Sequence, residues 1–138
     1  MDICQQIRQI IEMGTYSSPK PPLEERIYNA FKVNGAGYIE KNFSNLIEGE
    51  RLGGPLHFVL NQIGYNLLNM NKLPEALEIF KLNVSLFPGE TNPHDSLAEA
   101  YILNDNTEKA LEQYKKVLEL DPSNKNAEQY IEKLERIK

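Results

Sequence analysis

Two stretches in the second half of the chain decide the fold: GYNLLNMNKLPEALEIFKLNVSLFPG at residues 64–89 and AEAYILNDNTEKALEQYKKVLELDPS at residues 98–123. Aligned without a gap, they place small, small, aromatic and proline residues in the same four columns, 34 residues apart. The columns hold Gly64, Ala76, Phe80 and Pro88 in the first stretch and Ala98, Ala110, Tyr114 and Pro122 in the second. Such a period is typical of arrays of repeated helical hairpins.

Each column has a packing role. The small residues lie where the two antiparallel helices of a hairpin approach closely, the aromatic residue fills the gap against the next hairpin, and the proline ends the second helix. Apolar periodicity and turn residues predict helices at about 2–13, 23–33, 38–48, 56–69, 74–86, 108–120 and 125–137. Asn92 and Pro93 are expected as N-cap and first residue of one more helix. A generic bundle is the alternative, but four roles recurring at one offset favour the repeat.

These roles resemble the tetratricopeptide repeat, with one unit starting at residue 57 and the next at residue 91. The resemblance implies an all-α, right-handed superhelix of helical hairpins. It divides residues 23–138 into a degenerate hairpin (23–54), two repeats (57–90 and 91–124) and a C-terminal capping helix (125–138). An N-terminal amphipathic helix (1–14) and a proline-rich linker (15–22) are expected before it.

The composition excludes several classes of function. The 138 residues carry 15 Lys and Arg against 20 Asp and Glu, a net charge of −5, whereas binding a phosphate backbone needs a basic surface. No stretch approaches the roughly 20 apolar residues that cross a bilayer, and the first residues lack the apolar run of a signal peptide. We therefore predict a cytoplasmic protein without nucleic-acid or membrane partners.

No group of residues has the spacing of a catalytic or metal site. Cys4 is the only cysteine, which excludes a multi-cysteine metal site, and His57 and His94 are expected on the surface. Ser17 and Lys20 match the Ser-x-x-Lys pattern of penicillin-recognising serine hydrolases, but no Lys-Thr-Gly or Ser-Asp-Asn accompanies them. The sequence predicts no enzyme activity, no metal and no cofactor.

In tetratricopeptide arrays the first helices of the units line a concave face that holds ligands. The second, fifth, ninth and twelfth residues of each unit share one stripe of that helix. The partner-binding candidates on the concave face are therefore Phe58, Asn61, Tyr65, Leu68, Asn92, Asp95, Glu99 and Ile102, with Asn126, Gln129 and Lys133 from the last helix. The alternative is a solvated face without a ligand.

The resemblance implies a non-catalytic adaptor that binds a protein or peptide on this face. Arrays that hold the acidic tails of heat-shock chaperones use lysine, arginine and asparagine there, whereas Asp95 and Glu99 predict that such a tail is not bound. In a second interpretation, residues 64–68 (GYNLL) and 80–84 (FKLNV) resemble the C-terminal repeat tails of bacterial serine hydrolases. The hairpin at 27–46 is similar to the segment that precedes those repeats. The chain would then be an accessory domain of a hydrolase, or a free-standing relative of one.

A last hypothesis concerns the N-terminal helix. Ile3, Ile7, Ile10 and Ile11 form one apolar stripe, and an exposed stripe of this kind favours association. This helix is therefore expected to dock on its own array or on another copy, and the second case would give self-association.

Overall fold

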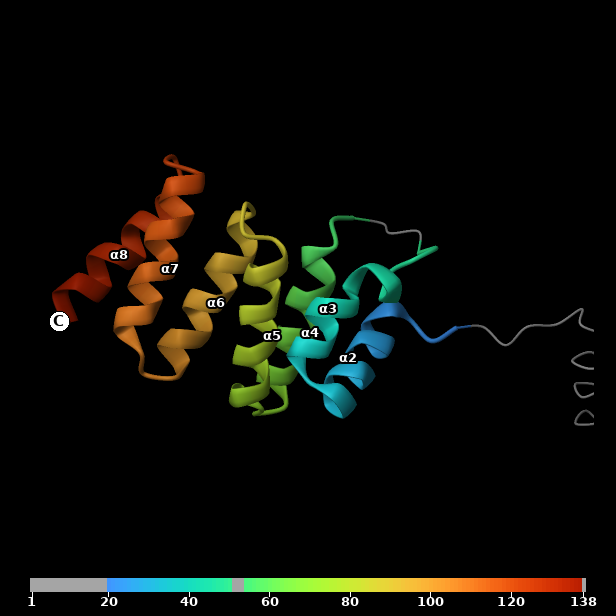
Figure 1. Cartoon of the computed structure of the whole chain (residues 1–138). Coiled ribbons are helices and arrows are strands. Elements are labelled where there is room, and N and C mark those ends of the chain that lie inside the picture. Colours follow the sequence, from blue (N-terminus) through green and yellow to red (C-terminus); the bar gives the residue numbers. More distant parts are fainter. Residues whose placement is uncertain (1–19, 51–53, 138) are drawn as a thin grey trace, which may run out of the picture.

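The computed structural model describes residues 20–50 and 54–137 of the chain. Within these ranges the chain forms helices and no strand, so the all-α prediction is confirmed. The helices lie in a row from α2 to α8 (Figure 1). Their bounds are α2 Leu23–Asn34, α3 Ala36–Leu46, α4 His57–Asn69, α5 Leu73–Leu86, α6 Thr91–Leu103, α7 Thr107–Leu120 and α8 Lys125–Ile137.

The helices pair into hairpins that stack on one another. Helix α2 packs on α3, α4 on α5 and α6 on α7, and α8 packs on α7. Between hairpins, α2 contacts α4 and α4 contacts α6, while α3 contacts α5. The first helices of the hairpins therefore form one layer (α2, α4, α6), and α3 and α5 form the other. Helix α5 also packs on α6, and α7 takes the place of the second helix in its own hairpin.

The turns inside the two C-terminal hairpins have the same conformation. Asn71 and Asp105, 34 residues apart, have φ angles of 59° and 55°, and short polar side chains are the ones that tolerate this left-handed region. The next backbone N–H donates to a carbonyl of the first helix in each case: Lys72 N to Leu67 O and Asn106 N to Tyr101 O, both at 2.9 Å. The 34-residue period thus extends to the backbone.

The repeated columns lie in the core. The small and aromatic members are all buried: Gly64, Ala76, Phe80, Ala98, Ala110 and Tyr114. Pro88 and Pro122 are exposed just beyond the ends of α5 and α7. The tightest approach is at Gly64, where a Cβ atom would lie 2.3 Å from Cε1 of Phe80. Only glycine leaves room there for the Phe80 ring.

The structure corrects the predicted starts of two helices, α6 and α3. This helix begins at Thr91 with Glu90 as its N-cap, so Asn92 is the second helical residue and the predicted N-cap is wrong. Proline is tolerated as the third residue because the first N–H groups of a helix have no intrahelical partner. The start of α3 also differs: Gly35, with φ of 81°, forms the break alone, and the helix begins at Ala36.

The prediction that both histidines lie on the surface is wrong. His57 is 6% exposed and His94 is 3% exposed. The two ring nitrogens of His94 lie 2.8 Å from Gln113 Oε1 and 2.9 Å from the Pro88 carbonyl oxygen. His94 therefore joins the end of one repeat to the second helix of the next, and these hydrogen bonds account for its burial.

The N-terminal helix at 1–14, the expected self-association through it, and most of the linker at 15–22 lie outside the described residues. Within the described part of the linker, Lys20, Pro21 and Pro22 are exposed and not helical. The self-association hypothesis stays a prediction.

Candidate functional site

The concave-face residues of α4 and α6 meet side by side. The Tyr65 hydroxyl donates a hydrogen bond to Oε2 of Glu99 at 2.8 Å, and Oγ of Ser96 lies 3.3 Å from the same hydroxyl. Tyr65 and Glu99 are the ninth residues of their units, 34 residues apart. Because α4 packs on α6 along this line, equivalent positions of the two units lie next to each other.

The candidate residues differ in exposure. Seven on α4 and α6 are half-buried, and we refer to this predicted binding face as the groove: Asn61, Tyr65, Leu68, Asn92, Asp95, Glu99 and Ile102. Phe58, at the start of α4, is 50% exposed. Asn126, Gln129 and Lys133 on α8 are exposed, and in the described part of the chain no hydrogen bond or ion pair joins them to α4 or α6. A hydrogen bond joins Tyr65 to Glu99. The described hydrogen bonds and ion pairs do not connect the α8 candidates to these two residues.

Asp95 and Glu99 give the groove a negative centre. They lie one helical turn apart on α6, and burial together with the nearby Glu99 charge raises the pKa of Asp95. Burial, with a further contribution from Glu99, raises the pKa of Tyr65 to about 12. Within residues 20–50 and 54–137, neither carboxylate forms an ion pair with a lysine, arginine or histidine. The negative charge of the groove is therefore not neutralised by described residues.

Three polar atoms around this centre are buried without a hydrogen-bond partner in the described structure. They are Oδ1 of Asn61 on α4, Oδ1 of Asn92 on α6 and the hydroxyl of Tyr114 on α7. The Tyr114 ring is fully buried and stacks on Tyr130 of α8, with ring centroids 4.8 Å apart. Such atoms are rare because burial without a partner costs roughly 1–3 kcal/mol.

The sequence analysis assigned Tyr114 a packing role alone and missed its hydroxyl. The signal is visible in the alignment, because the same column holds Phe80 in the first repeat, which has no hydroxyl. The sequence analysis also missed Ser96, since it occupies a sixth position of its unit, outside the stripe. A small buried side chain at that position brings its oxygen to Tyr65.

A second hollow lies between α2 and α4. This cavity of about 260 Å³ is lined by Glu24, Glu25 and Tyr28 of α2 and by Ile63, Asn66, Leu67 and Met70 of α4. This cavity was not predicted from the sequence, because the first hairpin matches the repeat only in part. The hollow lies between two first helices, at the N-terminal end of the same layer as the groove.

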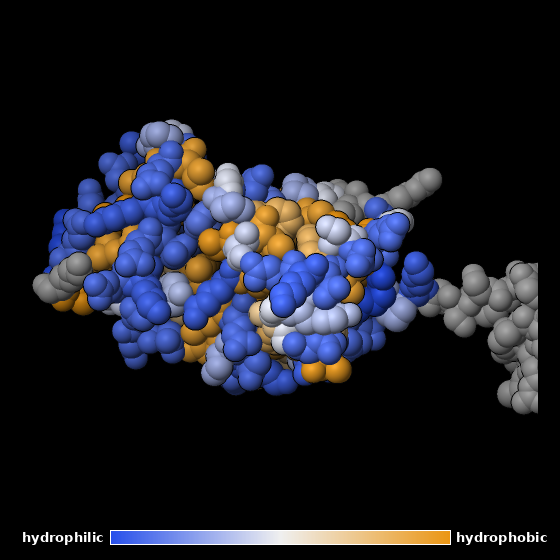
Figure 2. Space-filling model, in the orientation of Figure 1, coloured by the Kyte–Doolittle hydropathy of each residue, from blue (hydrophilic) through white to orange (hydrophobic). Residues whose placement is uncertain are grey.

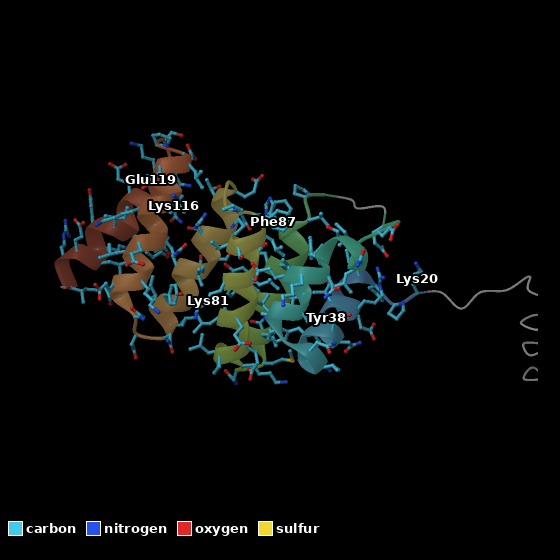
Figure 3. The ribbon with its side chains drawn as sticks, in the orientation of Figure 1. Lys20, Tyr38, Lys81, Phe87, Lys116 and Glu119 are labelled. Atoms are coloured by element: carbon cyan, nitrogen blue, oxygen red, sulfur yellow. The ribbon has the colours of Figure 1, made fainter. Side chains whose placement is uncertain are left out.

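The layer of second helices carries a different surface. Tyr38 of α3, Lys81 of α5, and Lys116 and Glu119 of α7 project from it (Figure 3). In the same orientation, hydrophilic residues cover most of this face (Figure 2). The described lysines of α5 and α7 thus belong to the opposite layer from Asp95 and Glu99.

The described residues contain no group of three or more His, Cys, Asp or Glu placed to hold a metal ion. Among the described helices, none is both long and apolar enough to span a bilayer.

Comparisons with known proteins agree on the fold. The family model described as tetratricopeptide repeat matches residues 92–124, which overlaps the repeat predicted at 91–124. No curated protein sequence matches the chain. Nothing in these comparisons bears on the serine hydrolase interpretation, which stays a prediction.

Several solved structures resemble the described chain. "First TPR of Spaghetti (RPAP3) bound to HSP90 peptide SRMEEVD" has a TM-score of 0.56 and 19% identity, over 83% of this chain and 89% of that one. The second TPR domain of human RPAP3, in complex with the HSP70 peptide SGPTIEEVD, has a TM-score of 0.54 and 18% identity, over 82% and 92%. The MamA RS-1 ArsTM double mutant has a TM-score of 0.54 and 19% identity, over 82% and 62%.

Identities this low show the fold alone, and with the family match they give one result. Residues 92–124 match the tetratricopeptide repeat model, and the described chain has the all-α superhelical fold of the tetratricopeptide repeat domains that it resembles.

Proposed function

We propose that the protein is a non-catalytic adaptor that binds a peptide segment of a partner protein along the groove of α4 and α6. The observation that carries the proposal is the contact between Tyr65 and Glu99, because it makes one continuous, half-buried face from two repeats. The solved structures that resemble this chain support it, since two of them are described as bound to peptides.

The side chains of the groove suit peptide recognition. Leu68 and Ile102 are half-buried apolar anchors at one end, and Phe58 is exposed at the other. Polar groups lie between these anchors, and a few well-placed polar groups among apolar ones fix the register of a ligand. Rigid helices hold all of these residues, so an extended segment would bind without a large cost of ordering the protein.

The groove differs in charge from one that takes an acidic tail. The HSP90 and HSP70 peptides named above both end in Glu-Glu-Val-Asp, whereas Asp95 and Glu99 would lie beside such a tail here. Like charges in a half-buried site repel each other more strongly than in water. We therefore propose that this groove does not bind acidic tails of that kind.

The test is a selection from a library of random displayed peptides against the immobilised protein. A selected peptide is then titrated into the ¹⁵N-labelled protein, with backbone amide shifts as the readout. The groove variant is Tyr65→Ala, Glu99→Lys. Its matched control is Tyr38→Ala, Glu119→Lys, which makes the same two changes at exposed positions of the second-helix layer.

The expected result is that amide shifts concentrate on α4 and α6, that the groove variant loses binding, and that the control variant keeps it. Circular dichroism checks that both variants stay helical. Selection of no peptide at all, or shifts confined to α5 and α7, would show that the groove assignment is wrong.

A further inference from the structure

The oxygen atoms of the groove that have no hydrogen-bond partner are of the acceptor type. Oδ1 of Asn61 and Oδ1 of Asn92 are buried without a partner, and the described hydrogen bonds use neither oxygen of Asp95 and only Oε2 of Glu99. The Tyr65 hydroxyl is the donor that serves Glu99. In the described structure the two helices thus carry several acceptor oxygens without a partner, while the Tyr65 hydroxyl donates to Glu99.

The Tyr114 hydroxyl lies close to the same region. Burial raises the pKa of Tyr114, and the charges of Asp95 and Glu99 raise it further, as does Tyr130. In the first repeat the equivalent Phe80 ring packs edge-on against Tyr65, 5.3 Å between centroids, and Glu99 is the residue equivalent to Tyr65. A tyrosine in this column therefore brings a hydroxyl to the base of the groove.

The described residues provide no cation for this site. Lys133 of α8 comes from a neighbouring helix, but its ammonium lies over the Tyr130 ring, 5.6 Å from the centroid. The described ion pairs of α7 and α8 join other residues: Lys115 to Glu135, Lys116 to Glu119 and Lys125 to Glu128. Asp95 and Glu99 are left as two adjacent negative charges in a partly buried position.

We propose that the groove binds a basic peptide segment, and that a lysine or arginine side chain of that segment lies between Asp95 and Glu99 above the Tyr114 hydroxyl. Ammonium and guanidinium groups carry donors and no acceptors, so they match a cluster of free acceptors. Their charge also relieves the repulsion between the two carboxylates. The proposal rests on the peptide-binding function proposed above and specifies the chemistry of the partner.

The buried Tyr114 oxygen is what distinguishes this site from an acidic patch on a surface. A fully buried hydroxyl without a partner costs free energy in the unliganded protein. A donor group from a ligand would satisfy the hydroxyl oxygen as an acceptor.

The experiment uses the random-peptide selection on the whole chain, with three forms of the protein. The site variant is Asp95→Asn, Glu99→Gln, which removes both charges and keeps an oxygen that can accept the Tyr65 hydrogen bond. The control variant is Glu108→Gln, Glu112→Gln, which removes the same charge from exposed positions on α7. Each selected peptide is then synthesised with its lysines and arginines replaced by glutamine one at a time.

The expected result is that peptides selected by the wild type and by the control variant are enriched in lysine and arginine. Replacing one of these residues weakens binding to the wild type roughly tenfold or more, and has little effect on binding to the site variant. Tyr114→Phe is expected to weaken binding of the same peptide several-fold without lowering the urea midpoint of the protein.

Two outcomes overturn the inference and separate it from the proposed function. If peptides bind in the groove by amide shifts but show no basic enrichment, or bind the site variant equally well, the basic-ligand proposal is wrong while the adaptor function stands. If no peptide binds the groove, both proposals are wrong.

Discussion

Replacing Gly64 by alanine sets two opposite effects against each other in the interior of α4. Helix propensity alone predicts a gain, because alanine is about 1 kcal/mol more favourable than glycine inside a helix. Packing predicts a loss. The added Cβ would lie 2.3, 2.6 and 2.8 Å from three ring carbons of Phe80, whereas carbon atoms in ordinary contact are about 3.5–4.0 Å apart.

The Phe80 ring has no room to retreat. It is fully buried, and Tyr65 packs edge-on against it at 5.3 Å between centroids. Overpacking of this kind costs about 1–3 kcal/mol. Because the overlap exceeds about 1 Å, we expect the cost of Gly64→Ala to lie near the upper end of that range. After the gain in propensity is subtracted, we expect Gly64→Ala to lower the free energy of unfolding by about 2 kcal/mol.

The second repeat shows why the position is sensitive in the first repeat only. Ala98 occupies the same column there, and Ala98 and Tyr114 are both fully buried. The residue equivalent to Tyr65 is Glu99, which has no ring to hold the aromatic side chain against the small residue. The restriction at Gly64 thus comes from the pair Tyr65 and Phe80 together.

Urea unfolding followed by circular dichroism measures the effect. With a slope of about 1–3 kcal/mol per molar urea, the midpoint should fall by roughly 1 M with the slope unchanged. Gly37→Ala is the matched control, because Gly37 is also helical but a Cβ there meets nothing within 4 Å. This control should leave stability unchanged or raise it by up to about 1 kcal/mol.

A double-mutant cycle tests the stated cause. In a Phe80→Leu background the smaller side chain makes room, so the cost of Gly64→Ala should largely disappear. If Gly64→Ala raises the midpoint as the Gly37 control does, the close contact with Phe80 does not govern this site and the reasoning fails.

Three further predictions concern single side chains. Asn83→Ala should lower the free energy of unfolding by about 1–3 kcal/mol, because it removes the buried hydrogen bond from Asn83 Nδ2 to the His57 carbonyl oxygen at 3.0 Å; an unchanged urea midpoint would contradict it. Asn106→Ala should cost about 1 kcal/mol in the same assay, since Asn106 Oδ1 accepts from Lys109 N at the start of α7. Tyr65 should ionise near pH 12, two units above its ordinary pKa. Folding therefore favours its neutral form, and this contribution to stability is lost as pH rises from about 10 to about 12. Difference titration of tyrosinate absorbance against Tyr65→Phe measures this pKa, and a transition near 10 would show that Tyr65 is not buried against Glu99.

The repeat units were predictable because their signals are local and recur. The columns of small and aromatic residues at 34-residue spacing, with turn residues between them, predict the helices of residues 57–137 to within two residues. The start of α6 was missed because Asn92 followed by Pro93 is a typical helix start. Thr91 can also begin the helix, since Pro93 needs no hydrogen-bond partner in its first turn.

The site was less predictable, because its properties depend on contacts between units. Periodicity places Tyr65 and Glu99 on the stripes of their helices, but it does not say that these side chains touch each other. The burial of His94 follows from its contacts with Gln113 and the Pro88 carbonyl. No local sequence pattern predicts these contacts. The binding of a basic peptide segment by these residues stays a prediction.

The row of helices has a thermodynamic consequence at its C-terminal end. Stability in such arrays is close to a sum of nearest-neighbour terms, so a helix opens with a free energy set by the neighbours it contacts. Helix α8 packs on α7, and its Tyr130 covers the ring of Tyr114. Each transient detachment of α8 therefore exposes the Tyr114 ring to water. The packing of α8 on α7 thereby sets the fraction of time for which Tyr114 is shielded from water.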